Sequence, residues 1–247
     1  MYDEKIDFEK LSKYNEHVIK LENLLKSVQL VGNYEQFRLA PCLMLFNFID
    51  LLRGVIVLDS HHMVTSGNII IRSMFEVLVD FLYCETDRKN LYLRFGEYQY
   101  VNRVLLYNSS PKEIQYEVNQ NEYQNITLPK YKEFLEKYNI KKEEYQKLQN
   151  WSGISIAKRV NKTKKNVPEM ENLYLNIYKI NCGYAHTYSD TICEYTSLCD
   201  QKINLSYEKK YIKDIFSTIR EVNSLVEIFY DNFKNNYANK SLANINF

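Results

Sequence analysis

The chain has 247 residues, of which 45% are hydrophobic and 26% are charged. These are ordinary values for a globular protein with a substantial core, and they exclude disorder of the bulk. The 32 basic residues nearly balance the 31 acidic ones, so any nucleic-acid site has to be local. With 6 Gly and 4 Pro, turns are too few for an all-β protein of this size. We therefore predict an all-α fold, a multi-helix bundle.

The N-terminus and the cysteines indicate a cytoplasmic protein. The first ten residues contain no basic stretch followed by an apolar run, as a secretion signal would. The most apolar stretch, Leu43–Leu58, is short for a membrane span and contains Asp50 and Arg53. We expect a buried helix there and no membrane association. The five cysteines form no CxxC pair, which predicts reduced thiols, no structural metal and no cofactor.

Long helices with near-heptad apolar spacing are predicted at both ends of the chain. The first lies within 1–34, where the apolar residues recur from Phe8 to Val28. The last lies within 205–237, after Ser206 as N-cap, with apolar residues from Ile212 to Phe233. Such helices pack on the body of their own chain or pair with a second copy or another protein. The periodicity leaves both arrangements open.

The middle of the chain is predicted to hold further core helices. Segment 37–108 contains three of them, with approximate bounds 38–59, 66–87 and 89–107. The break at Asn108–Pro111 opens a more polar segment, 111–167, which we interpret as an insertion or lid. Another core helix is expected within 168–200, starting near Pro168. Together, residues 1–247 are predicted to form a single helical domain.

One narrow arc of helix 66–87 is polar on an otherwise apolar helix. At 100° per residue this arc contains Asn68, Arg72, Glu76, Asp80, Tyr83 and Asp87. It is either a thin solvent-exposed strip or the lining of a polar pocket. Arg72 precedes Glu76 by four residues, the weaker orientation for a surface pair. This order favours a pocket in which Arg72 holds an anion and Glu76 orients it.

Helix 38–59 carries a similar polar arc that includes Asp50. Its surroundings in the sequence are strongly apolar, and a buried carboxylate without a partner is costly. Asp50 is therefore predicted either to line a wet cavity or to form a buried ion pair, with Arg72 or with Arg53.

Segment 173–190 is the richest in potential catalytic groups. Tyr174 and Tyr178 share one helical face, and Cys182, His186 and Asp190 share another. His186 with Asp190 one turn later matches an oriented general base, whereas a histidine bonded to core tyrosines is the structural alternative. Cys182 and His186 also have the spacing of a metal pair, but no second pair completes it, so no metal is expected.

A short basic run follows Trp151, formed by Lys158, Arg159, Lys162 and Lys164. Such a run indicates either a surface that grips phosphates or a solvated loop whose charge Glu169 and Glu171 offset. The sequence has no GxxxxGK[ST], GxGxxG, GxSxG or HExxH motif. Nucleotide-binding loops, the hydrolase nucleophile elbow and the zinc-protease helix are therefore not expected.

Two pieces of the sequence carry a family resemblance. The first is IIIRSMFEVLVDFLY, with an Arg-Ser-x-x-Glu core at Arg72, Ser73 and Glu76. The second is WSGISIAKR at Trp151–Arg159, followed by Tyr174, Tyr178 and His186. In combination they resemble a bacterial and phage family known as domain-of-unknown-function family 5677. The resemblance implies a helical fold and no particular activity. It also implies that certain residues are neighbours: Arg72, Glu76, Trp151, Tyr178 and His186.

Two hypotheses about function follow. The first is a ligand-binding or protein-interaction module with a polar pocket around Arg72, Glu76 and His186, which takes a small anion, a peptide or a nucleotide segment. Further ligand-binding residues would be Asp50, Asp80, Trp151 and Tyr178. The second is a metal-independent phosphodiesterase or ribonuclease of a toxin or phage-defence type, with His186 as acid or base and Arg72 holding the phosphate.

The similarity of the family to the higher-eukaryote-and-prokaryote nucleotide-binding (HEPN) ribonucleases motivates the second hypothesis. Those enzymes carry Arg and His a few residues apart on one helix, whereas Arg72 and His186 are far apart in this sequence. A structural or regulatory partner protein with satisfied polar arcs is a third possibility. Both functional hypotheses require that Arg72 and His186 open onto one shared hollow.

Overall fold

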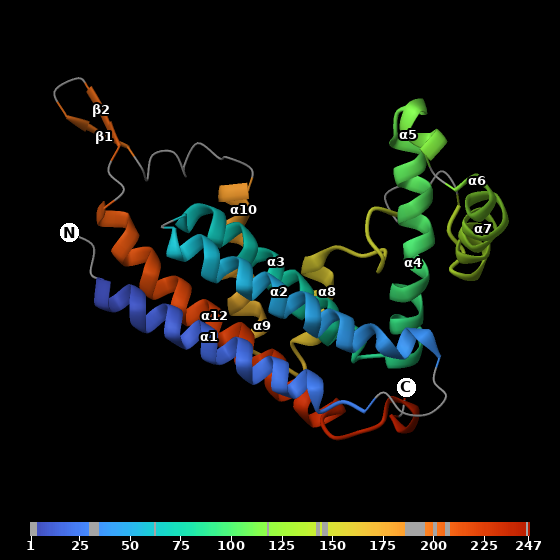
Figure 1. The fold of residues 1–247 in the computed structure, drawn as a ribbon, viewed down its shortest axis with the longest axis horizontal. Coiled ribbons are helices and arrows are strands. Elements are labelled where there is room, and N and C mark those ends of the chain that lie inside the picture. The colour runs from blue at the N-terminus through green and yellow to red at the C-terminus, as the bar shows by residue number, and fades with distance from the viewer. Residues whose placement is uncertain are drawn as a thin grey trace.

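The computed structural model describes residues 4–29, 35–61, 63–117, 119–141, 144, 148–185, 196–199, 202–205, 208–245 and 247. Within these residues helices predominate, and the single pair of strands is short (Figure 1). The predicted all-α bundle with long N- and C-terminal helices is confirmed.

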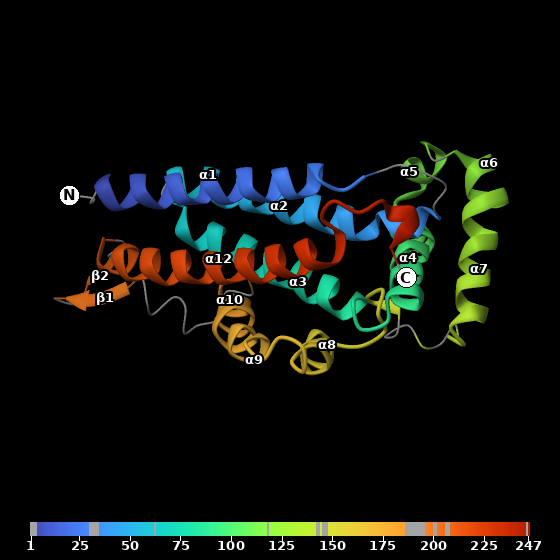
Figure 2. The ribbon, with the colours of Figure 1, turned by 90° about the horizontal axis from the view of Figure 1, so that it is seen from below.

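Four long helices form the body of the molecule (Figure 2): α1 (Glu4–Lys26), α2 (Ala40–Ser60), α3 (Val64–Cys84) and α12 (Glu208–Tyr237). α2 packs along α1 and α3, and α12 packs on α1 and α3. The space between them is filled by large apolar side chains, among them Phe48, Phe81 and Phe229, which are fully buried. The rings of Phe81 and Phe229 stack at 4.6 Å between centroids.

The apolar faces of the two terminal helices turn into the core of their own chain. Tyr14 and Leu21 of α1 are fully buried, as are Val226 and Phe233 of α12. The near-heptad spacing is therefore explained by packing within one chain. Pairing of these helices with a second chain stays a prediction, and Ser206 lies outside the described residues.

Helix α2, the first of the predicted core helices, is preceded by the short turn η1 (Gln36–Leu39). Pro41 lies in the first turn of α2. The inner face of α2 contributes Leu45, Phe48 and Leu52 to the core. Among the described residues, Phe37–Ser60 is the one helix that length and composition would allow to cross a membrane. Its mean hydropathy is 1.8, and 44% of its most apolar window is buried. The core helix of a bundle has the same composition.

An arm projects from one end of the bundle (Figure 1). It consists of α4 (Arg88–Ser109), α5 (Lys112–Glu117), α6 (Gln120–Glu122), the π-helical turn η2 (Tyr123–Thr127) and α7 (Leu128–Lys137). α7 packs on α4. At the corner between α3 and α4, Glu85 Oε1 accepts hydrogen bonds from the hydroxyls of Tyr92 at 2.6 Å and Tyr237 at 2.5 Å. Arg88 donates to Glu85 Oε2 at 2.7 Å.

The chain then returns along the outer face of α3 (Figure 2). This layer consists of α8 (Ile156–Thr163), α9 (Met170–Leu173), the π-helical η4 (Tyr174–Lys179) and α10 (Ile180–Ala185). α8, η4 and α10 each contact α3. The 3-10 turn η5 (Leu242–Asn244) follows α12 near the C-terminus.

Two segments differ from the expected organisation. Residues 196–199, expected to belong to a core-helix segment 168–200, form strand β1 (Thr196–Cys199), which pairs antiparallel with β2 (Lys202–Leu205). Thr196 faces Leu205, and Leu198 faces Ile203, so β-branched and aliphatic residues meet across the strands, as strands favour. Segment 111–167, expected to be a polar insertion or lid, places several side chains in the core: Phe134, Ile140, Leu148, Trp151 and Val160.

Candidate functional site

One turn of the polar arc of α3, at Arg72 and Glu76, lies against η4. Arg72 Nη2 lies 3.2 Å from Glu76 Oε1, and the Arg72 guanidinium lies 4.9 Å from the centre of the Tyr178 ring. Burial lowers the pKa of Arg72, but the Tyr178 hydroxyl and the Glu76 carboxylate raise it by more. Burial also raises the pKa of Tyr178, against the effect of Arg72. These three residues are neighbours, as the family resemblance implies.

One turn further along α3, Asp80 binds two residues of the returning layer. Its Oδ2 accepts a hydrogen bond of 2.9 Å from Trp151 Nε1, and its Oδ1 forms an ion pair with Arg159 Nη1. Arg159 is only 8% exposed. Burial lowers its pKa, whereas the neighbouring Glu76 and Tyr178 raise it. Glu76 and Tyr178 therefore act on both guanidiniums, those of Arg72 and Arg159.

Local structure explains why Arg159 points inward. Ser155 caps the N-terminus of α8, its side chain accepting from the Lys158 backbone N–H at 3.4 Å. From this start, positions 156, 159, 160 and 163 share one face at helical spacing and are all buried. The guanidinium is thus carried to α3 on the apolar face of α8, where the Asp80 carboxylate compensates its charge.

The loop before α8 is fixed to α4. The Trp151 carbonyl accepts a hydrogen bond of 2.8 Å from Arg94 Nε, and the Leu148 carbonyl accepts one from the Tyr98 hydroxyl. Gly153 has a φ of 70°, in the left-handed region that glycine adopts without strain. Trp151 is therefore held from two sides. α3 binds its indole N–H, and α4 binds its backbone carbonyl.

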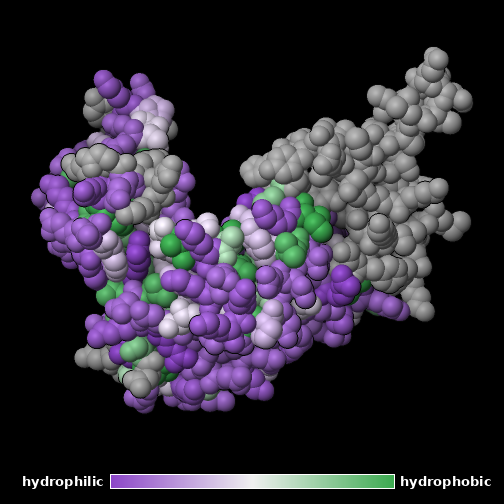
Figure 3. Space-filling model, turned by 180° about the vertical axis from the view of Figure 1, so that it is seen from behind, coloured by the Kyte–Doolittle hydropathy of each residue, from purple (hydrophilic) through white to green (hydrophobic). Residues whose placement is uncertain are grey.

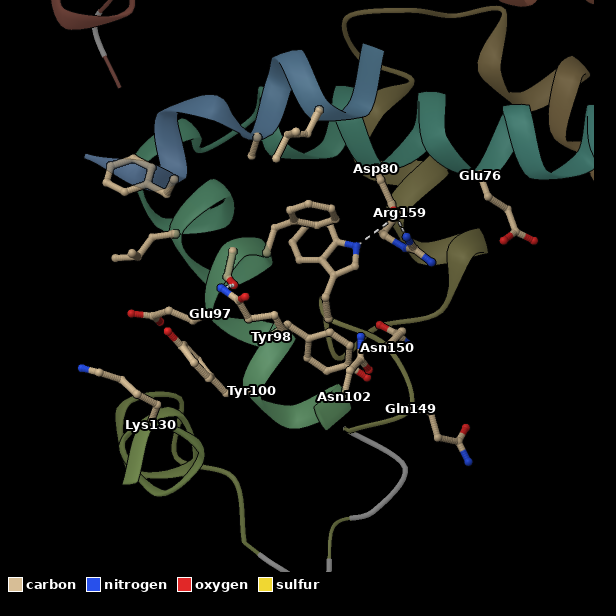
Figure 4. Close-up of a pocket in the computed structure, with 18 of the residues that line it drawn as sticks. Glu76, Asp80, Glu97, Tyr98, Tyr100, Asn102, Lys130, Gln149, Asn150 and Arg159 are labelled. Carbon is tan, nitrogen blue, oxygen red and sulfur yellow. Dashed lines mark hydrogen bonds and ion pairs between the residues drawn. The ribbon is translucent and has the colours of Figure 1, made fainter. Parts of the chain in front are cut away.

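A cavity of about 880 Å³ lies between these elements (Figure 4). α3 and α8 contribute Glu76, Asp80 and Arg159, the loop contributes Trp151, and the opposite wall comes from α4, η1 and the start of α2. Lys130 of α7 lines the side of the cavity away from Glu76. The surface is hollowed between the arm and the bundle (Figure 3). In the part of the chain that the structure describes, no group of three or more His, Cys, Asp or Glu side chains is placed to hold a metal ion.

Residues 38–204 match the Family of unknown function (DUF5677). The match runs from η1 to β2 and includes α3, α4, the Trp151 loop and α8. The chain belongs to this family. The searches of curated proteins and of solved structures each found no match. The DUF5677 region thus contains the helices that build both walls of the cavity, and the family description states no activity.

The cavity of this DUF5677 chain gathers part of the predicted site. Four of the predicted residues line it: Glu76, Asp80, Trp151 and Arg159. Arg72 and Tyr178 adjoin it through Glu76. His186 lies outside the described residues, so the expected hollow shared by Arg72 and His186 stays a prediction.

Other predicted residues lie elsewhere. Asp50 is exposed on α2 and does not line the cavity, so it needs no buried partner, contrary to the expectation from its apolar neighbours. In the basic run, Lys158 and Lys162 are exposed, and Lys164 lies 3.7 Å from Glu171. The run was expected to be either a phosphate-gripping surface or a solvated loop. Arg159 fits neither, because it belongs to the apolar face of α8 and is buried against Asp80.

Sequence reasoning missed the α4 wall of the cavity. This wall includes Phe95, Glu97, Tyr98, Tyr100 and Asn102. Apolar, aromatic and charged residues alternate around the whole circumference of α4, so no polar arc stands out as it does on α3. One signal was the aromatic content of 98–100, since aromatic side chains often line ligand sites.

Proposed function

We propose that this protein is a binding module that holds a ligand in the cavity between its arm and its bundle. Arg159 carries the proposal. It lines the cavity, and its ion pair with Asp80 is made through Nη1. A guanidinium has five donors, and buried polar groups are nearly always hydrogen-bonded. A ligand in the cavity can supply the further acceptor that this guanidinium needs.

The walls around Arg159 are suited to binding because they are already in place. Asp80 fixes both Trp151 and Arg159, and Arg94 fixes the loop from the other side. A ligand that meets preformed walls does not have to order them, which favours affinity. The cavity volume of about 880 Å³ lies within the range of roughly 300–1,000 Å³ typical of ligand sites.

Three of the four carboxylates of the cavity are ion-paired, which favours binding over catalysis. Glu76 pairs with Arg72 at 3.2 Å, Asp80 pairs with Arg159, and Glu97 pairs with Lys137 at 2.8 Å. Because their oxygens already bind a cation of this chain, these carboxylates are poorly placed to act on a ligand. The described lining also contains no Ser, Thr, Cys or His side chain, the groups that most often act as nucleophile or base.

Phosphodiester cleavage is the alternative function. The exposed Lys158 and Lys162 on α8 support it, because they could steer an RNA toward the site, with His186 as acid or base and Arg72 as phosphate holder. We favour ligand binding over phosphodiester cleavage because Arg72 and Arg159 each face a carboxylate. Their charges are largely neutralised before a phosphate arrives.

Trp151 provides a direct test, because it is the single tryptophan of the chain and lines the cavity. Protein labelled with 5-fluorotryptophan gives one ¹⁹F resonance that reports on this wall. We expect at least one class among amino acids, peptides, nucleotides and sugars to shift it saturably. The shift should disappear in Asn102→Arg, which fills the cavity from an exposed position on α4.

A matched control exists on the same helix. Asn108 is also exposed on α4 but does not line the cavity, so Asn108→Arg should bind like the wild type. If no class of ligand moves the wild-type resonance, the proposed function is wrong. It is also wrong if both arginine variants respond like the wild type.

A further inference from the structure

We infer that the ligand is an extended peptide segment of a protein partner. This inference rests on the proposed function and names the ligand class of the same cavity. Three properties of the lining support it: its balance of charges, its combination of apolar and amide side chains, and its course from the bundle to the arm.

The charges that line the cavity disfavour nucleic acid. Four carboxylates line it, from Glu35, Glu76, Asp80 and Glu97, against two cations, from Lys130 and Arg159. Proteins bind the phosphates of nucleic acids with an excess of Lys and Arg. Here the excess is acidic, and Lys130 is itself paired with Glu133 at 2.8 Å. A neutral or basic ligand fits this lining better than a polyanion does.

One part of the lining is apolar and fits a hydrophobic side chain. Phe37, Leu43, Leu93 and Phe95 line the cavity, and Leu43 is 60% exposed. Covering such a side chain with apolar surface is favourable by roughly 25 cal/mol per Å². A leucine this exposed beside a cavity is therefore a natural contact for an apolar side chain of a partner.

The remaining lining fits a peptide backbone. The side-chain amides of Asn102, Gln149 and Asn150 line the cavity, and each carries both a donor and an acceptor. A peptide backbone presents the same two groups at every residue, so these amides can pair with an extended chain. The Arg159 guanidinium adds donors for a backbone carbonyl or a C-terminal carboxylate.

The form of the cavity fits an extended chain. Figure 4 shows Glu76 and Lys130 on opposite sides of the lining, with Tyr98 between them. The lining thus runs from α3 of the bundle to α7 of the arm. An extended strand advances about 3.3 Å per residue, so several consecutive residues can lie along it.

The test selects binders from a random decapeptide library displayed on phage, using the full-length protein as target. We expect enriched peptides to share an apolar residue and to be poor in Asp and Glu. A synthetic enriched peptide should shift the ¹⁹F resonance of Trp151. Its Kd should rise at least tenfold in Asn102→Arg and in Leu43→Ser and stay unchanged in Asn108→Arg. All three positions are exposed, and each variant is accepted only if its Tm matches that of the wild type.

Oligo(U) and oligo(dT) of ten nucleotides form the second arm of the test. If they shift the Trp151 resonance and no peptide does, the peptide inference is overturned while the binding function stands. Enrichment of acidic peptides would overturn the charge argument and with it this inference. If neither peptides nor the other ligand classes move the resonance, the proposed function fails as well.

Discussion

Trp151 and Asp80 are joined by a hydrogen bond of 2.9 Å between the indole Nε1 and the carboxylate Oδ2, although they are 71 positions apart in the sequence. The other oxygen of the same carboxylate holds Arg159. One side chain of α3 therefore fixes both the loop before α8 and the inward face of α8. This makes the α3 side of the cavity a single connected unit.

Asp80→Ala should destabilise the protein strongly, because it leaves the Arg159 charge buried without its partner. Breaking a buried ion pair in this way costs about 3–5 kcal/mol. Asp50→Ala is the control, since Asp50 is exposed on α2 and surface substitutions change stability by about 0.5 kcal/mol or less. Urea unfolding followed by circular dichroism measures both.

A second variant separates charge from packing at Asp80. In Asp80→Ala/Arg159→Met the buried charge is absent together with its partner, so most of the lost stability should return. If the double variant is as unstable as Asp80→Ala alone, the loss has another cause than the unpaired guanidinium.

Arg72→Ala should destabilise the protein much less than Asp80→Ala does. Arg72 pairs with Glu76 within one helix and lies over the Tyr178 ring, with 20% of its side chain exposed. A helical ion pair and a partly exposed cation–π contact are each worth roughly 0.5–1 kcal/mol at most, so the free energy of unfolding should fall by about 1 kcal/mol. A loss as large as that of Asp80→Ala would show that the polar arc of α3 is structural throughout.

The local parts of this site could be predicted from the sequence. The Arg72–Glu76 pair lies within one helix, four residues apart, and helical periodicity alone places both on the polar arc. The inward direction of Arg159 was also readable, since Ile156, Val160 and Thr163 share its face at helical spacing. The lysines around Arg159 obscured this helical spacing, because a run of basic residues suggests a solvent-exposed segment.

The other parts depend on packing between distant segments. Nothing in α4 itself shows that its Asn102 face lies opposite α3, since that follows from the corner at Glu85 and from the arm as a whole. The π-helical turn Tyr174–Lys179 has a wider turn than an α-helix. Projection at 100° per residue therefore loses phase there, and it does not relate Tyr178 correctly to Cys182.

The stability of the protein should fall at alkaline pH because of the corner at Glu85. Burial, together with the Glu85 carboxylate, raises the pKa of Tyr92 and of Tyr237 above the ordinary value, which is about 10. The folded state thus keeps these protons when the unfolded state loses them. The two tyrosines therefore contribute fully to the free energy of unfolding below about pH 10, and this contribution is lost as the pH rises above that value.

Chemical unfolding between pH 8 and pH 11.5 measures this loss. Tyr237→Phe should be less stable at pH 8, because one hydrogen bond to Glu85 is lost, by about 1–3 kcal/mol. Above pH 10 it should depend less steeply on pH than the wild type does. Equal slopes for the two proteins would contradict the assignment to this corner.

Cys42 should resist alkylation in the folded protein. Burial raises its pKa to about 11, whereas an ordinary thiol has a pKa of about 8.5. At pH 8 the thiolate fraction, which governs reactivity, is then about two hundred times smaller than in the unfolded chain. Mass spectrometry of the Cys42 peptide after iodoacetamide treatment, with and without urea, measures the ratio. Equal labelling rates in both conditions would contradict the burial of this thiol.

RNA incubated with the wild type should give the same gel pattern as RNA incubated with His186→Ala. The reason lies in and beside the cavity, where Arg159 already faces Asp80 and Arg72 already faces Glu76. The charges of these two guanidiniums are therefore largely compensated, and they would stabilise a phosphodiester transition state poorly. Chelator is present in both samples to suppress contaminating metal-dependent nucleases. Cleavage that the wild type performs and His186→Ala does not would place phosphodiester chemistry ahead of binding, because the imidazole would then act as the acid or base that such cleavage needs.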